Sequence, residues 1–68
     1  MTENKYEIND DWGVEYQDLE NIRKSGITNM WGAAPYLAKR AGISQELATK
    51  ILLNWMHNYN ELAKKYNW

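Results

Sequence analysis

Hydrophobic residues recur at helical spacing in three stretches of this chain. In the first stretch they are three or four residues apart, which places them on one side of a helix. These residues are Trp12, Tyr16, Leu19 and Ile22. Asp10 or Asp11 is the expected N-cap, and Gly26 is the expected stop, because glycine takes the left-handed conformation without a Cβ penalty. The pattern predicts a first helix over residues 11–25.

The second stretch contains the only proline of the chain, Pro35. Its apolar residues are Met30, Trp31, Ala34, Leu37, Ala38 and Ala41. Thr28 or Asn29 is the expected N-cap, and Gly42 is the expected stop. Proline costs about 3 kcal/mol inside a helix, because it lacks the N–H and its ring clashes with the preceding turn. We therefore expect a short turn over residues 28–33 that leads into a helix with Pro35 at its first position. A helix kinked at Pro35 is the alternative.

The third stretch is the longest and begins at the clearest cap in the sequence, Ser44. Ile43 before this cap and Ala48 after it match a hydrophobic staple. The apolar residues that follow are Leu47, Ile51, Trp55, Tyr59, Leu62 and Tyr66. One helix over residues 44–66 would be about 34 Å long, which is more than the first two helices can cover. Its far half is expected to project past them, to fold back at Asn58 or Asn60, or to contact another chain.

Three helical patterns without strand alternation predict an all-α protein. We expect a small three-helix bundle with a long C-terminal helix, formed as one domain by residues 11–68. Residues 1–10 are mostly polar, with Tyr6 and Ile8 as their large apolar side chains. They predict a flexible N-terminal segment.

Aromatic residues are numerous, because four of the 68 residues are Trp and five are Tyr. Each can bury about 150–250 Å² while its polar group stays at the rim of the core. Four of them follow the apolar pattern and are expected in the core: Trp12, Tyr16, Trp31 and Trp55. Four others lie at the edge of the pattern or beyond it and predict a protein-binding surface: Tyr36, Tyr59, Tyr66 and Trp68.

The composition offers little for catalysis. There is no Cys, so thiol nucleophiles, thiolate metal sites and disulfides are excluded. His57 is the only imidazole, and we expect it at the surface rather than as a general base. The glycines are spaced as helix stops and a close-packing site, not as a phosphate-binding loop. We therefore expect a protein that is not an enzyme and that holds no cofactor and no metal ion.

Neither a membrane segment nor an export signal is apparent in the sequence. No apolar run approaches the roughly 18 residues that a membrane helix needs. The first residues lack the basic and apolar parts of a signal peptide. We expect a cytoplasmic protein without a membrane partner.

Charge is divided unevenly along the chain. Eight Lys and Arg stand against nine Asp and Glu, and the resulting net charge of −1 disfavours nucleic acid as a partner. Residues 1–32 carry a net charge of −4, and residues 33–68 carry +3. Surplus aromatic surface beside basic residues favours a protein partner. The expected contact residues are Tyr36, Lys39, Arg40, Tyr59, Lys64, Tyr66 and Trp68.

Two other functions remain open from the same residues. The junction at residues 41–44 resembles the glycine-containing turn of a helix-turn-helix. A DNA-binding protein of this kind would use Gln45, Thr49 and Lys50, although Glu46 in the same turn would repel phosphate. In a self-associating structural protein, the acidic first helix of one copy would contact the basic long helix of another.

Residues 19–37 read LENIRKSGITNMWGAAPYL, and a helical pattern ending in Trp55-Met56 follows. This combination resembles a group of short, largely uncharacterised proteins of bacteriophages and related mobile elements, which share an SG[VI]TNM[FW]GAAPYL core and a later Trp-Met pair. The resemblance covers a little over half of the chain. Trp31 stands where other members tend to have Phe. The resemblance implies a phage or mobile-element origin. Small helical proteins of phage type that lack Cys and are rich in Trp most often bind host proteins, so we expect a phage-encoded protein that modulates or inhibits a protein of the bacterial host cell.

Overall fold

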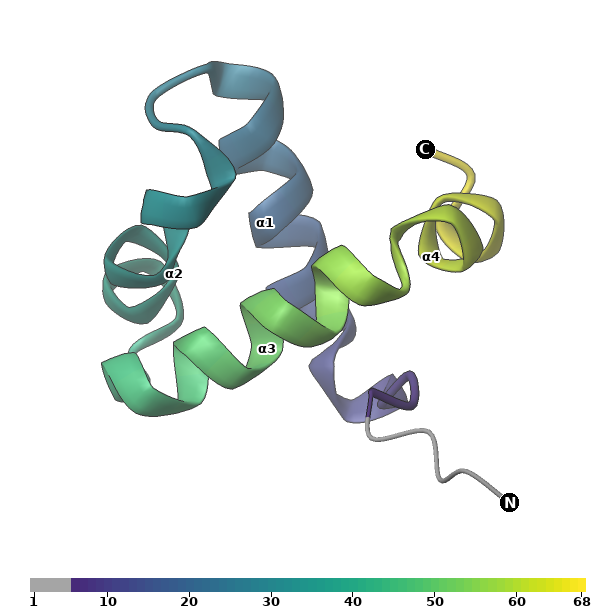
Figure 1. Ribbon diagram of the computed structural model, residues 1–68, viewed down its shortest axis with the longest axis horizontal. Coiled ribbons are helices and arrows are strands. Elements are labelled where there is room, and N and C mark those ends of the chain that lie inside the picture. Colours follow the sequence, from purple (N-terminus) through teal and green to yellow (C-terminus); the bar gives the residue numbers. More distant parts are fainter. Residues whose placement is uncertain (1–5) are drawn as a thin grey trace.

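Four α-helices and two single-turn 3-10 helices make up the structure, a computed structural model that describes residues 6–68 (Figure 1). The α-helices are α1 (Gly13–Ser25), α2 (Ala33–Ala41), α3 (Gln45–His57) and α4 (Tyr59–Tyr66). The 3-10 helix η1 (Asp10–Trp12) leads into α1, and η2 (Met30–Gly32) leads into α2. No strand occurs in residues 6–68, so the all-α prediction is confirmed. Within this part of the chain, no helix has both the length and the apolar character needed to cross a membrane.

One hydrophobic core lies where α1, α2 and α3 pack against one another. α1 buries the side of its helix that the spacing predicts, including Tyr16, Leu19 and Ile22. α2 buries Leu37 together with small residues, which allow the neighbouring helices to come close to its backbone. Trp55 of α3 is 3% exposed and completes the core.

Local signals place the ends of the first two helices and the start of the third. Gly26 and Gly42 have φ angles of 69° and 68°, and they end α1 and α2 in the left-handed conformation, as predicted. The Ser44 hydroxyl accepts a hydrogen bond of 3.1 Å from the Leu47 N–H at the start of α3. This predicted cap is confirmed.

The start of the first helix differs from its prediction. Neither Asp10 nor Asp11 is the cap. Instead, the side chain of Asn9 accepts a hydrogen bond of 2.9 Å from the Asp11 N–H at the start of η1. The cap lies earlier in the chain because η1 precedes α1, and α1 itself has no side-chain cap.

Pro35 does not kink α2, because it is the third residue of this helix. The first four N–H groups of a helix have no partner within it, so the missing N–H of proline costs nothing there. The Asn29 side chain caps η2 by accepting a hydrogen bond of 3.1 Å from the Gly32 N–H. The expected short turn that leads into a helix is therefore confirmed, with Pro35 at the third position instead of the first.

The predicted long C-terminal helix is two helices. α3 ends at His57, and α4 begins after Asn58, whose φ of −107° and ψ of 15° depart from helical values. The buried Asn58 amide donates hydrogen bonds to the carbonyl oxygen of Tyr6 and, at 3.1 Å, to that of Asn54. The chain therefore folds back at Asn58, which is one of the three outcomes that the sequence leaves open.

After this break, α4 packs against α1 instead of projecting from the bundle. Leu62 is fully buried. The Tyr66 ring lies 6.4 Å from the Tyr16 ring, and the Trp68 ring stacks on Tyr66 with centroids 5.5 Å apart. The Trp68 indole N–H donates a hydrogen bond of 3.0 Å to Gln17 Oε1 on α1. The bundle therefore has four helices where the sequence pattern predicts three.

The N-terminal segment expected to be flexible lies in part outside the described residues, because the structure describes none of residues 1–5. The residues that follow are tied to α3 and α1. Asn54 Nδ2 donates a hydrogen bond of 2.7 Å to the Glu7 carbonyl oxygen. The Tyr16 hydroxyl accepts a hydrogen bond of 3.0 Å from the Asn9 N–H and donates one of 2.7 Å to Asn54 Oδ1.

Candidate functional site

The structure divides the predicted contact residues between two ends of the molecule. Tyr36, Lys39 and Arg40 are exposed on α2, whereas the other four lie on α4 or just after it. α2 packs near the start of α3, and α4 follows its end (Figure 1). The 13 residues of α3 span about 20 Å, so the two groups do not form one surface.

The aromatic residues of the α4 group are already engaged within the chain. The Tyr59 hydroxyl donates a hydrogen bond of 3.1 Å to Glu20 Oε1, and Trp68 is bonded to Gln17. Tyr59, Tyr66 and Trp68 are all half-buried, although the sequence places them beyond the reach of the core. Their surface is covered because α4 folds back on α1. Lys64 alone in this group is fully exposed.

Trp31 is the largest departure from the predicted core. Its side chain is 78% exposed, more than any other large hydrophobic residue in residues 6–68. The sequence pattern assumes a helical period of 3.6 residues from Met30 onward into α2. In the structure, η2 is instead a 3-10 helix with about three residues per turn. The change of period turns Trp31 outward while Ala33 and Ala34 are buried.

The turn that carries Trp31 is fixed by its own side chains. Asn29 caps η2, and the chain continues directly into α2. A Cβ atom on Gly32 would lie 2.8 Å from Thr28 Oγ1, so a larger residue at this position would displace the Thr28 side chain. The indole is therefore presented to solvent by an ordered turn and not by a loose loop.

Several exposed residues follow one another along the chain in η2 and α2. They are Trp31, Pro35, Tyr36, Lys39 and Arg40, which we call the α2 face. Within α2, Pro35 and Lys39 are four positions apart, as are Tyr36 and Arg40, which is helical spacing, and Trp31 precedes them in η2. The opposite side of α2 is buried in the core, so the helix cannot turn away from this orientation.

The α2 face is basic. Arg40 Nε lies 3.9 Å from Asp18 Oδ1, a long ion pair at the surface that leaves the guanidinium half-exposed. Lys39 makes no ion pair within residues 6–68. Two aromatic rings beside two cations resemble the composition of binding hot spots, in which Trp, Tyr and Arg are enriched.

Beside the α2 face lies a shallow open groove of about 240 Å³ between α1, η2 and α3. Its lining residues are Arg23, Met30, Trp55, Met56 and Tyr59, and we call it the methionine groove. Met30 and Trp31 are consecutive residues of η2, so the groove and the α2 face adjoin. The sequence pattern did not single out this groove.

A buried carboxylate supports one wall of the methionine groove. Arg23 donates to Glu20 through Nε (3.1 Å to Oε1) and Nη2 (2.6 Å to Oε2). These hydrogen bonds lower the pKa of Glu20, against the effect of its burial. Burial and the hydrogen bond to Glu20 raise the pKa of Tyr59. Glu20 is therefore held as a fully paired anion.

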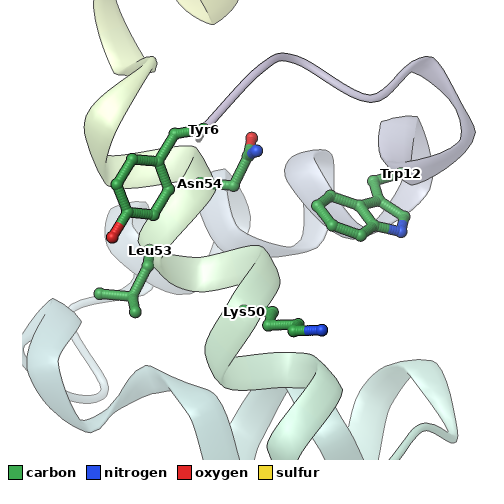
Figure 2. Close-up of a pocket in the computed structure, with 5 residues that line it drawn as sticks. All are labelled: Tyr6, Trp12, Lys50, Leu53 and Asn54. Atoms are coloured by element: carbon green, nitrogen blue, oxygen red, sulfur yellow. The ribbon is translucent and has the colours of Figure 1, made fainter. Parts of the chain in front are cut away.

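A second cavity, of about 480 Å³, lies between the N-terminal segment and α3. Figure 2 shows the rings of Tyr6 and Trp12 on either side of α3, with Lys50 and Leu53 projecting from the helix. Asn54 also lines the cavity, but both of its polar atoms already serve contacts within the chain.

The residues considered for DNA recognition lie on the exposed side of α3. Gln45, Thr49 and Lys50 are all exposed, and the Thr49 hydroxyl donates a hydrogen bond of 2.9 Å to the Gln45 carbonyl oxygen. Glu46 is exposed among them. The structure thus brings these three residues together, with the carboxylate between them.

The opposite charges of the two halves meet within a single molecule. Lys65 Nζ lies 2.8 Å from Asp10 Oδ1, and Arg40 approaches Asp18. The hydrogen bond that Lys65 donates to the Asp10 carboxylate raises the pKa of Lys65. Part of the charge complementarity that the sequence offers for self-association is therefore used to join the N-terminal half to the C-terminal half.

The described residues contain no group of three or more His, Asp or Glu side chains placed to hold a metal ion. His57 is exposed, and its ring lies 4.6 Å from that of Tyr6. No family model matches the chain, and no curated protein and no solved structure is similar to it. The geometry of the α2 face and its neighbouring grooves is therefore the basis for a functional conclusion.

Proposed function

We propose that this protein is a small interaction module that binds another protein through the α2 face. The observation that carries the proposal is the 78% exposure of Trp31 on an ordered turn. An exposed indole keeps a large apolar area in contact with water, which is unfavourable. Covering the ring with a partner removes this unfavourable contact. Following the phage resemblance of residues 19–37, the partner is a bacterial host protein, which the module modulates or inhibits.

The rigidity of the α2 face supports this role. The backbone of a short capped turn loses little conformational freedom on binding, and the ordering of flexible segments is one of the costs of association. Tyr36 and Arg40 supply further contacts of the kinds that dominate binding energy, and Lys39 supplies a free cation. The arrangement needs no chemistry beyond contact, in line with the expectation that the protein is not an enzyme.

A capture experiment with one substitution tests the proposal. Tagged wild-type protein and Trp31→Ala would be used to capture partners from nuclease-treated bacterial lysate, followed by affinity measurements with the captured protein. We expect Trp31→Ala to weaken binding at least about 30-fold, which corresponds to a hot spot of about 2 kcal/mol. Its free energy of unfolding should change by no more than about 0.5 kcal/mol, because the side chain is exposed.

Val14→Ala is the matched control. Val14 is apolar and 72% exposed, but it lies at the opposite end of α1 from η2. Its removal should leave affinity unchanged. Equal affinity of wild type and Trp31→Ala for every captured protein would overturn the assignment of the α2 face.

A helix-turn-helix DNA-binding protein is the second candidate, and one observation favours it. α2 and α3 are joined through the left-handed Gly42, and Gln45, Thr49 and Lys50 are exposed together at the start of α3. For this candidate, duplex DNA should bind with an affinity that falls steeply between about 50 and 200 mM salt, because phosphate contacts release counterions. Lys50→Ala should also weaken the binding of duplex DNA, compared with the wild type.

Fluorescence anisotropy with labelled duplex DNA at several salt concentrations separates the two candidates. Binding through the α2 face to a protein should depend far less on salt, because its anchor is an uncharged indole. We expect no steep salt dependence and no effect of Lys50→Ala. A steep salt dependence together with weaker DNA binding by Lys50→Ala would instead assign DNA binding through α3 as the function.

A further inference from the structure

We propose that the partner inserts an apolar side chain, flanked by its own carboxylates, into the methionine groove. This inference rests on the proposed function and names the chemistry of the partner: an acidic peptide segment with an apolar anchor. It extends the interface from the α2 face across η2 to the groove between α1 and α3.

The size and lining of the groove fit one large apolar side chain. Its volume of about 240 Å³ is below the roughly 300–1,000 Å³ typical of small-molecule pockets. Met30 and Met56 are both half-buried, and thioether side chains adapt their shape to different apolar surfaces. Such a surface accepts an anchor without requiring one exact shape.

Trp55, which lines the groove, carries a buried donor without an acceptor. The indole N–H of Trp55 is buried and has no hydrogen-bond acceptor within residues 6–68. Buried donors without partners are rare and call for an explanation. Because this N–H is buried, a peptide oxygen can reach it only where binding moves the Trp55 ring, and the Trp55 indole N–H signal would report such a movement.

The charges around the groove select an acidic partner. Arg23 lies on its rim with a side chain that is 45% exposed, and Lys24 beside it is exposed. The carboxylate in contact with the groove lining is Glu20, and both of its oxygens are already paired with Arg23. The adjoining α2 face adds Lys39 and Arg40. Arg23 and Arg40 are each paired with one carboxylate, whereas Lys24 and Lys39 make no ion pair within residues 6–68, so a negatively charged segment gains these two cations as partners.

Methyl NMR with a defined peptide pair tests this inference. The probes are two synthetic helical peptides with identical leucine positions, one with Glu and the other with Lys at the remaining polar positions. We expect the acidic peptide to shift the methyl signals of Met30 and Met56 and the Trp55 indole N–H signal in a saturable manner. Met56→Leu, which keeps the volume nearly constant, assigns the methyl signals.

Two charge variants complete the test. Arg23→Gln and Lys24→Gln should each weaken binding of the acidic peptide several-fold at low salt, whereas Val14→Ala should not. Because the two variants remove different cations, and Lys24 makes no ion pair within residues 6–68, a folding defect in Arg23→Gln would leave the Lys24 result interpretable. Unmoved methyl signals, or equal shifts with the basic peptide, would overturn the inference.

The outcomes separate this inference from the proposed function. Unmoved methyl signals, together with a captured partner whose affinity depends on Trp31, would overturn the groove as a binding site and leave the α2 face as the proposed binding surface. Peptide binding in the groove, together with a captured partner whose affinity does not depend on Trp31, would support the groove and overturn the α2 face. Methyl shifts that follow protein concentration without peptide would identify a second copy as the occupant and overturn the acidic partner.

Discussion

Leu37→Ala is expected to remove a large part of the stability of this protein. Leu37 is fully buried, and the other buried residues of α2 are two alanines, so this side chain is the main attachment of α2 to the core. Truncation of a buried leucine costs about 2–5 kcal/mol, from lost burial and from the cavity left behind. A 68-residue chain has a total stability of only about 3–10 kcal/mol.

Urea unfolding followed by circular dichroism measures this loss, and Leu53→Ala is the matched control. Leu53 has the same chemistry but is 38% exposed on α3, so its truncation should cost less than about 1 kcal/mol. The melting temperature should fall by at least about 10 °C in Leu37→Ala, given about 4–8 °C per kcal/mol for a domain of this size. A loss no greater than that of Leu53→Ala would mean that α2 is not docked on the core through Leu37.

The predictions that succeed depend on neighbouring residues in the chain. Gly26 and Gly42 end helices because their backbones take positive φ, and Ser44 caps α3 through an N–H three residues later. Such signals need no knowledge of the tertiary fold, and sequence patterns capture them. The same holds for the exposure of Lys39 and Arg40, which follows from the buried opposite side of α2.

The predictions that fail depend on residues far apart in the chain. The apolar spacing continues through Asn58, and the break there is accompanied by a contact with the Tyr6 carbonyl, 52 residues away. Tyr59 and Trp68 look surplus in the sequence because their acceptors, on Glu20 and Gln17, lie on α1. Periodicity within one helix cannot identify such partners.

The sequence contains an indication that Trp31 is exposed, although its apolar spacing suggests the core. A turn over residues 28–33 was expected from Pro35 and the N-cap candidates, and a turn does not share the helical period of the residues after it. Counting Trp31 on the same apolar side as Leu37 therefore combined two different periods. The most exposed large hydrophobic residue of residues 6–68 was placed in the core for this reason.

Arg23→Met is the second substitution with a large expected effect, and the effect should depend on pH. Methionine keeps the apolar stem of the side chain but leaves the buried Glu20 carboxylate with only the Tyr59 hydroxyl. Breaking a fully buried pair costs about 3–5 kcal/mol. Because the Arg23 side chain is 45% exposed and screened by water, we expect about 2–3 kcal/mol at pH 7.

The sign of the pH dependence follows from the pKa of Glu20. Arg23 lowers this pKa in the folded state, so the pair stabilises the wild type above the unfolded value of about 4.3. This stability is lost as the pH falls through the lowered pKa, where the carboxylate takes up a proton. In Arg23→Met, burial favours the protonated carboxyl, so the variant should approach the wild type toward pH 3.

Urea unfolding between pH 3 and pH 7 measures the difference between the two proteins. Lys24→Met is the control, because it removes a neighbouring cation that is exposed and makes no ion pair within residues 6–68. Adding Glu20→Gln to Arg23→Met should recover part of the loss at pH 7, since no unpaired charge then remains buried. A gap that is constant with pH and unaffected by Glu20→Gln would instead assign the loss to the contact of the Arg23 guanidinium with the Tyr59 ring, whose centroid lies 5.6 Å from the guanidinium carbon.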